Sequence, residues 1–69
     1  MITNEQLNNV LLHLKDEGVS YKFIANLADI SYDTFYYYRR CKNYPIVERM
    51  KLEKVLRDTF GELFDEYAE

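Results

Sequence analysis

The chain has 69 residues, enough for one small domain (1–69) that buries only about 60% of its unfolded surface. Its hydrophobic content of 48% excludes a disordered chain, and no run approaches the ~20 apolar residues of a membrane span. The formal net charge of −3 excludes a uniformly basic nucleic-acid binder, so any attraction to phosphate has to come from local clusters of positive charge.

The first predicted helix covers residues 4–17. Thr3 and Gln6 have the spacing of a capping box, and Gly18 is a residue type typical of a helix C-terminal end. Between them, apolar residues recur on one face of the helix. These residues are Leu7, Val10, Leu11 and Leu14.

Two short helices joined by a tight turn are predicted over residues 20–40. Ser20 and Ser31 can each accept a hydrogen bond from a free backbone N–H of the following turn, so we expect both to be N-caps. The apolar spacing places one side of the first helix against Phe35 and Tyr38 of the second, which is the pattern of a helix-turn-helix. The residues on that side are Ile24, Ala25 and Ala28, with Ile30 in the turn.

This region resembles the helix-turn-helix of lambda-repressor-like (XRE-type) DNA-binding domains, and the resemblance extends more loosely over most of the chain. The matching run is SYKFIANLADISYDTFYYYRR. Asp29 stands where the family usually has Gly in the turn, and Asp enters the left-handed region more readily than most residues. The resemblance implies an all-α, compact domain of four to five helices, and a small regulator of the bacterial or phage type that binds double-stranded DNA as a homodimer.

In that family the second helix of the motif enters the major groove, and its outward residues meet base edges. The resemblance therefore implies that helix 32–40 is inserted into DNA. The groove-facing residues it implies are Ser31, Tyr32, Asp33, Tyr36, Tyr37 and Arg40. Arg40 can form a bidentate pair with guanine, and Asp33 can accept from a cytosine amino group. The phosphate contacts are expected from Lys22, Arg39 and Lys42.

A third region, after residue 44, is predicted to be helical. Pro45 suits the first turn of a helix because its missing N–H costs nothing there. Up to Thr59, a rough apolar pattern is formed by Met50, Val55 and Leu56, with Ile46 or Val47 at the start. Gly61 is expected to interrupt this helix.

The last apolar stripe, which resembles the short final helix of the family, consists of Phe60, Leu63, Phe64 and Tyr67. One interpretation is that it closes the core of the monomer, which the small size of the chain favours. The other is that it forms a two-fold dimer interface, which would place two recognition helices about one helical turn of DNA apart.

Charge is unevenly distributed along the chain. Residues 1–38 carry two basic and five acidic side chains, residues 39–57 carry seven and two, and residues 58–69 carry none and five. Their net charges are therefore −3, +5 and −5. Because potentials decay over roughly 8 to 10 Å at physiological salt, the central basic stretch can attract phosphate in an acidic protein. The alternative is that this stretch is a solvated helix face.

The residues needed for catalysis or metal binding are scarce. His13 is the single histidine, on the polar side of the first helix, where we expect it to be solvated. Cys41 is the single cysteine, which excludes an internal disulfide and fits a reducing cytoplasm. We therefore expect no enzyme activity, metal, cofactor or small-molecule substrate.

Two functions follow from these observations. The first is a sequence-specific DNA-binding transcriptional regulator that occupies an operator through helix 32–40. The second is a protein-binding inhibitor or adaptor of the phage type, including a DNA mimic, which uses the same fold to dock on a host protein. Acidic helix faces and displayed tyrosines favour the second function.

Overall fold

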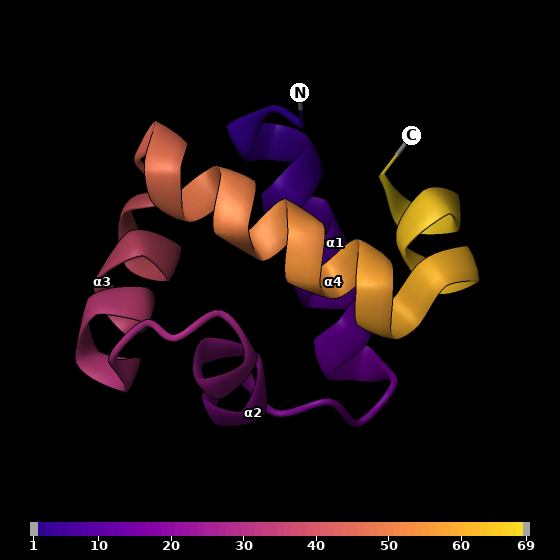
Figure 1. The fold of residues 1–69 in the computed structure, drawn as a ribbon, viewed down its shortest axis with the longest axis horizontal. Coiled ribbons are helices and arrows are strands. Elements are labelled where there is room, and N and C mark those ends of the chain that lie inside the picture. Colours follow the sequence, from indigo (N-terminus) through magenta and orange to yellow (C-terminus); the bar gives the residue numbers. More distant parts are fainter. Residues whose placement is uncertain (1, 69) are drawn as a thin grey trace.

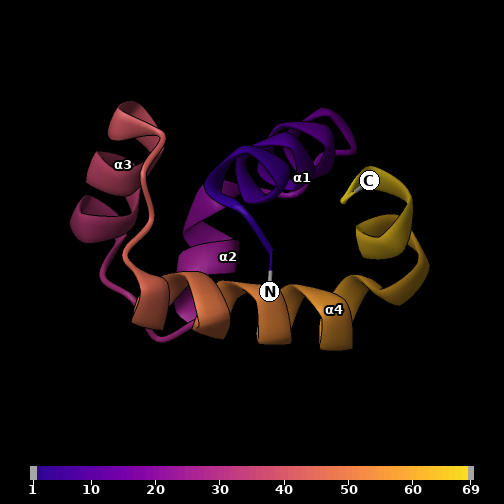
Figure 2. The ribbon, with the colours of Figure 1, turned by 90° about the horizontal axis from the view of Figure 1, so that it is seen from above.

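The computed structural model describes residues 2–68, and within them the chain is helical with no strands. The helices are α1 (Asn4–Asp16), α2 (Tyr21–Leu27), α3 (Tyr32–Cys41) and α4 (Ile46–Tyr67). Helices α1 and α4 form two layers, α2 lies between them, and α3 lies at one end of the molecule (Figures 1 and 2). The all-α prediction is confirmed, and the two helices predicted over residues 20–40 are α2 and α3.

The predicted helix starts are all present. Thr3 Oγ1 accepts from the Gln6 N–H, and Gln6 Oε1 accepts from the Thr3 N–H, both at 3.0 Å. Ser20 and Ser31 each accept a backbone N–H three residues further on, at 3.1 and 3.3 Å. These bonds satisfy N–H groups that have no partner inside the helix, which explains why α1, α2 and α3 begin where they do. Helix α4 begins directly after Pro45, without a side-chain cap.

The first three helices end in the same way. A residue with positive φ follows each helix: Gly18 (96°), Asp29 (55°) and Lys42 (54°). The next backbone N–H then donates to the carbonyl five residues before it, at 2.9 to 3.3 Å, as in a Schellman motif. Asp29 thus adopts the left-handed conformation that the turn requires, whereas the left-handed conformation of Lys42 had no signal in the sequence.

The predicted apolar face of α4 is wrong in its N-terminal half. Ile46, Val47 and Met50 are more than half exposed, while Leu52, which the pattern omitted, is fully buried with Leu56. Helix α4 packs mainly on α1. Leu52 and Leu56 are four residues apart, so they lie on the same, inward side of α4. At 100° per residue the three exposed side chains lie on the remaining, outer part of the helix.

Tyr44, in the connection between α3 and α4, belongs to the core. Its side chain is 1% exposed, its N–H donates to Asn4 Oδ1 at 2.9 Å, and its hydroxyl donates to Asn8 Oδ1 at 3.1 Å. Burial raises the pKa of Tyr44, and the neighbouring Arg39 partly opposes that shift. The connection between α3 and α4 is therefore anchored on α1 by a buried aromatic residue.

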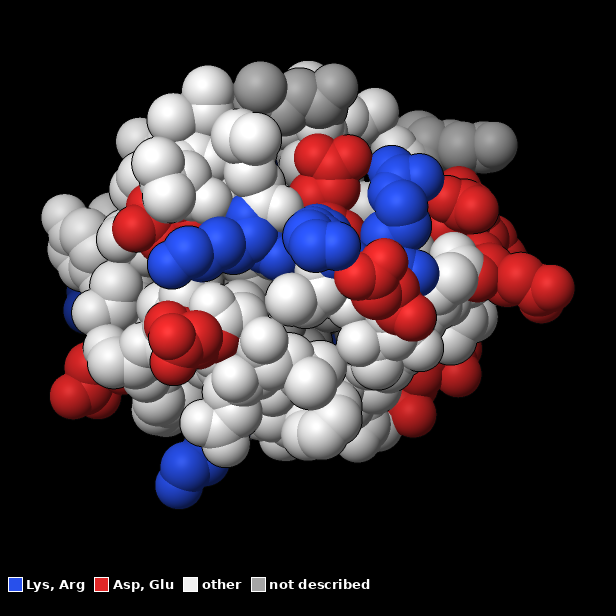
Figure 3. Space-filling view, in the orientation of Figure 1, with Lys and Arg blue, Asp and Glu red and all other residues white. Residues whose placement is uncertain are grey.

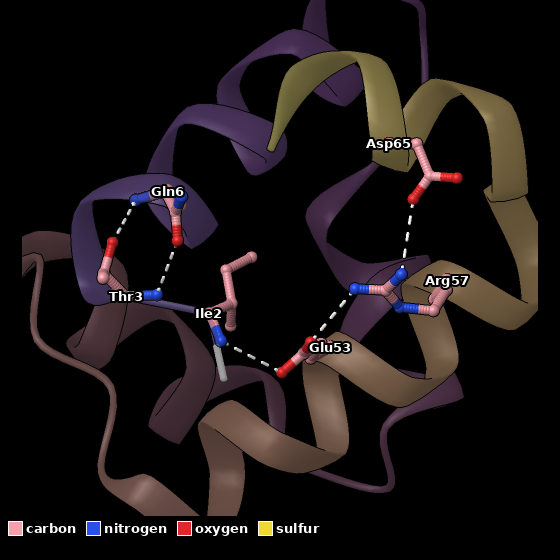
Figure 4. Close-up of polar contacts among 6 residues, drawn as sticks. All are labelled: Ile2, Thr3, Gln6, Glu53, Arg57 and Asp65. Atoms are coloured by element: carbon pink, nitrogen blue, oxygen red, sulfur yellow. Dashed lines mark hydrogen bonds and ion pairs between the residues drawn. The ribbon is translucent and has the colours of Figure 1, made fainter. Parts of the chain in front are cut away.

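Gly61 interrupts α4, as predicted, with φ 32° and ψ −97°, a conformation that side chains disfavour. Beyond it the chain folds back over the core and buries Phe64 completely. The Arg57 guanidinium holds this segment: it donates to Glu53 at 3.1 Å and to Asp65 at 3.4 Å (Figure 4). It also stacks 4.7 Å from the Phe64 ring. With the segment after the kink counted as part of α4, the described residues form four helices, within the predicted four to five.

The last apolar stripe closes the core, the first of its two interpretations. Phe64 has no exposed surface to offer a second chain, and the other members are half-buried against the core. The Tyr67 hydroxyl donates to Glu17 at 3.1 Å, and its ring meets His13 edge-on at 4.3 Å between ring centroids. The expectation of a solvated His13 is therefore corrected, because this histidine is half-buried under the last segment.

Candidate nucleic-acid interface

The outward side of α3 displays five side chains, which we call the α3 surface. They are Tyr32, Asp33, Tyr36, Tyr37 and Arg40. The three tyrosines are 42%, 52% and 62% exposed. None of the five side chains forms a hydrogen bond or an ion pair with another residue of the 2–68 range. The sequence placed these residues correctly on the solvent side, because Phe35 is buried and Tyr38 half-buried on the opposite side of the helix.

Packing against α2 orients this surface. Ile24 and Ala25 of α2 and Phe35 of α3 are 0 to 1% exposed, so the two helices meet through fully buried contacts. Such close packing leaves α3 little freedom to rotate about its axis. The exposed side chains of α3 therefore point in a fixed direction relative to the rest of the domain.

Ser31, which was also expected to face the groove, serves the helix itself. Its hydroxyl accepts the Thr34 N–H at 3.3 Å and donates to Thr34 Oγ1 at 2.7 Å. The residue is exposed, but both hydrogen-bonding roles of its hydroxyl are occupied by the N-cap.

The three residues expected to contact phosphate differ in their surroundings. Lys22 and Lys42 are exposed and form no ion pair with any residue that the structure describes. Arg39 is half-buried: its Nη1 donates to Asn8 Oδ1 at 2.6 Å, and its guanidinium carbon lies 4.5 Å from the centroid of the Tyr21 ring. The side chain of Arg39 therefore connects α3 to α1 and α2 instead of extending freely into solvent, and its contact with phosphate stays a prediction.

The basic stretch 39–57 is not one continuous positive surface. On α4, Lys54 pairs with Asp58 at 3.3 Å, and Arg57 pairs with Glu53 and with the carboxylate of Asp65. Figure 3 shows basic side chains following α4 with acidic side chains directly beside them. This part of the stretch is a solvated helix face with its own counter-charges, the alternative interpretation of the sequence.

Several exposed residues were missed by sequence reasoning. Phe23 on α2 is 48% exposed. An open groove of about 810 Å³ on the outer side of α4 includes Val47 and Met50 in its lining. Lys15, at the end of α1, places its Nζ 5.1 Å from the centroid of the Tyr21 ring. The last contact joins two helices, so no local pattern could have indicated it.

Within residues 2–68, no three or more His, Cys, Asp and Glu side chains are grouped so that they could hold a metal ion. None of the helices in that range is long and apolar enough to cross a membrane. Cys41 is exposed, with a free thiol.

Comparisons with known proteins bring no relative. No family model matches the chain, and neither a curated protein nor a solved structure matches it. The function therefore has to be inferred from the geometry and chemistry of the α3 surface.

Proposed function

We propose that this protein is a sequence-specific DNA-binding transcriptional regulator with a lambda-repressor-like helix-turn-helix, formed by α2 and α3. The observation that carries the proposal is the α3 surface. Three exposed tyrosines and an arginine without an ion pair among the described residues lie on a helix whose opposite side is buried. Tyrosine and arginine displayed together are typical of residues that contact a partner.

The dimensions of α3 suit the major groove. Its 10 residues span about 15 Å, and a groove about 12 Å wide accepts an α-helix. In this proposal the N-terminal half of α3 meets base edges. Asp33 accepts from a cytosine amino group, and the tyrosine rings pack on thymine methyl groups or donate their hydroxyls to phosphate.

The distribution of charge supports the same orientation. Arg40 and Lys42 lie at the C-terminal end of α3 and Lys22 lies on α2, all three without ion pairs among the described residues. The acidic last segment lies at the opposite end of the molecule from α3, along a longest dimension of 27 Å (Figure 2). That separation exceeds the roughly 8 Å Debye length at physiological salt, so the acidic segment hardly weakens the attraction of phosphate to α3.

Fluorescence anisotropy with labelled DNA duplexes tests this function. If Lys22, Arg40 and Lys42 each neutralise one phosphate, log affinity falls with log salt at a slope of about −2.7 per protomer. Selection from random duplexes should then enrich a defined sequence that binds at least about a thousandfold more tightly than unselected DNA. Affinity that does not change with salt would contradict the proposal.

Operator binding by two copies would give the usual two-fold arrangement of such regulators, with α3 helices about 34 Å apart. We therefore propose a homodimer on DNA, which sedimentation of the protein with its selected duplex would detect as two protomers per duplex. A single protomer per duplex would restrict the proposal to monomeric binding.

A separate observation favours protein binding as a second function. Ile46, Val47 and Met50 form an exposed apolar patch on the first turns of α4. Contiguous exposed apolar side chains often mark a protein contact. If docking on a host protein is the function, Met50→Glu abolishes it, and no duplex is bound at any salt concentration.

A further inference from the structure

Two cationic side chains lie against the ring of Tyr21, at the start of α2, and a third lines the pocket beside it. Lys15 Nζ, from α1, lies 5.1 Å from the ring centroid, and the Arg39 guanidinium, from α3, lies 4.5 Å from it. Arg40 lines the same place, a pocket of about 170 Å³ between α2 and α3. We call it the Tyr21 pocket; its lining residues are Tyr21, Phe35, Tyr36, Arg39 and Arg40.

The positive charge of this pocket has no counter-charge among the described residues. The lining contains two arginines and no acidic side chain. Neither Lys15 nor Arg40 forms an ion pair within residues 2–68. Like charges brought together in this way repel, so an anion in the pocket would stabilise the folded domain.

Arg39 adds a second, independent observation. Its Nε is buried and has no hydrogen-bond partner in the described part of the chain, although its Nη1 donates to Asn8. Buried donors in native proteins almost always have a partner, and a bound ion or water is one of the explanations for an orphaned donor. The orphaned donor belongs to a residue that lines the pocket.

We propose that the Tyr21 pocket binds a phosphate-type oxyanion, which, if the proposed function holds, is a phosphate of the DNA backbone. Guanidinium groups match the oxygens of phosphate with paired N–H donors. Arg40, which is exposed, makes the direct ion pair, and Tyr36 is part of the same lining. Asn8 is a positioning residue, because it holds Arg39 against the Tyr21 ring.

This inference changes the role of Arg40. The residue lies eight positions after Tyr32, so it is about 12 Å from the N-terminal end of α3. In helix-turn-helix proteins that N-terminal end is the part that meets base edges. Arg40 therefore contacts the backbone, and the bidentate pair with guanine that its residue type suggested is replaced by a phosphate contact.

Nuclear magnetic resonance of the Nε–Hε groups of arginine tests the pocket directly. The full chain is titrated with inorganic phosphate in a phosphate-free buffer at constant ionic strength, adjusted with chloride. We expect saturable shifts of the Arg39 and Arg40 signals. Arg40→Ala should weaken the binding about tenfold or more, while Lys51→Ala, the removal of an exposed cation on α4, should leave it unchanged. Linear shifts that are equal for all arginines, or no shifts, overturn the proposal.

A second titration, with a mixed-sequence DNA duplex, identifies the source of the phosphate. If the duplex shifts the same two signals and inorganic phosphate competes with it, the occupant is the DNA backbone. If inorganic phosphate shifts them and the duplex does not bind, the pocket stands as a free-anion site and the proposed function fails. If the duplex binds with a salt-dependent affinity but leaves both signals unmoved, the pocket proposal fails and the proposed function survives.

The role of Arg40 has its own readout. As a phosphate contact, Arg40→Ala weakens binding to all duplexes by a similar factor and reduces the salt slope by about 0.9. Arg40→Lys keeps the charge and should restore most of that slope. Loss of preference at a single base pair, with the slope unchanged, would instead make Arg40 a base-reading residue and overturn its assignment to the pocket.

Discussion

An arginine stacked on an aromatic ring occurs at both ends of the molecule, with different surroundings. At the C-terminal end, Arg57 covers the buried Phe64 and pairs with two carboxylates, so its charge is neutralised by other residues of the same chain. At the α3 end, Arg39 covers Tyr21 beside a second arginine and no carboxylate.

Residue type alone therefore does not distinguish an arginine that stabilises the fold from one that binds a ligand. Both side chains stack at a similar distance from their rings, 4.7 and 4.5 Å. What differs is the supply of counter-charge in the neighbourhood. At the C-terminal end, the carboxylates neutralise Arg57, and this arginine stabilises the fold. At the α3 end, no carboxylate neutralises the arginines, so they can attract an anion from solution.

The largest effect, on the free energy of unfolding, is expected at the C-terminal end. Phe64→Ala removes a fully buried ring and should lower the free energy of unfolding by about 3 to 5 kcal/mol, measured by urea denaturation. The matched control is Tyr37→Ala on the α3 surface, which should change it by less than about 0.5 kcal/mol. Equal losses would mean that the two aromatic groups do not differ in role. Phe64→Leu, with an intermediate loss, covers the case in which the alanine variant does not fold.

The two arginines should also differ in what they contribute to stability. Arg39→Ala breaks the 2.6 Å bond to Asn8 and the contact with Tyr21, and it should cost about 2 kcal/mol. Arg57→Ala should cost about 1 kcal/mol or less, because its ion pairs are exposed to water. Added salt should reduce the stability cost of Arg57→Ala and hardly change the stability cost of Arg39→Ala. A larger cost for Arg57 would show that its carboxylate pairs, including the Glu53 that also accepts the Ile2 N–H at 3.2 Å, outweigh the Arg39 contacts.

Substitutions on the α3 surface should change DNA affinity rather than stability. Tyr37→Ala should weaken binding to the selected duplex about fivefold, which corresponds to about 1 kcal/mol, with an unchanged unfolding curve. Tyr38→Ala, which removes a half-buried ring on the opposite side of α3, serves as the contrasting variant and should mainly lower stability. Unchanged DNA affinity for Tyr37→Ala would remove this residue from the proposed groove contacts.

An effect about as large as that of Tyr37→Ala on binding is expected at Tyr44, which anchors the connection between α3 and α4 on α1. Tyr44→Phe loses the hydroxyl bond to Asn8 and should cost about 1 kcal/mol at neutral pH. Because the pKa of Tyr44 is raised in the folded state, its contribution is complete below the ordinary tyrosine pKa of about 10 and is lost as the pH rises through the folded value. Urea unfolding between neutral and alkaline pH should therefore show a shallower decline for Tyr44→Phe than for the unchanged protein. Parallel declines would contradict the role of burial at this hydroxyl.

Local signals determined the secondary structure. The caps at Thr3, Ser20 and Ser31 join residues three apart, so the sequence contains both partners of each bond. The exposed side of α3 followed from the position of Phe35 and the helical period alone.

Contacts between distant residues decided the rest. Met50 and Leu52 are both apolar residues of α4, but Leu52 is buried and Met50 is exposed because α1 packs on the side of α4 that carries Leu52. The burial of Tyr44 depends on Asn4 and Asn8, about forty residues earlier in the chain.

For the candidate site, the sequence by itself determined which side chains α3 displays, because the helical period is a property of the backbone. Only the tertiary structure decided which cations remain available: it committed Arg39 to Asn8 and brought Lys15 beside Tyr21 from another helix. The physical reason is that a charge is neutralised by its neighbours in space, within a few ångströms, and the order of residues does not encode those distances.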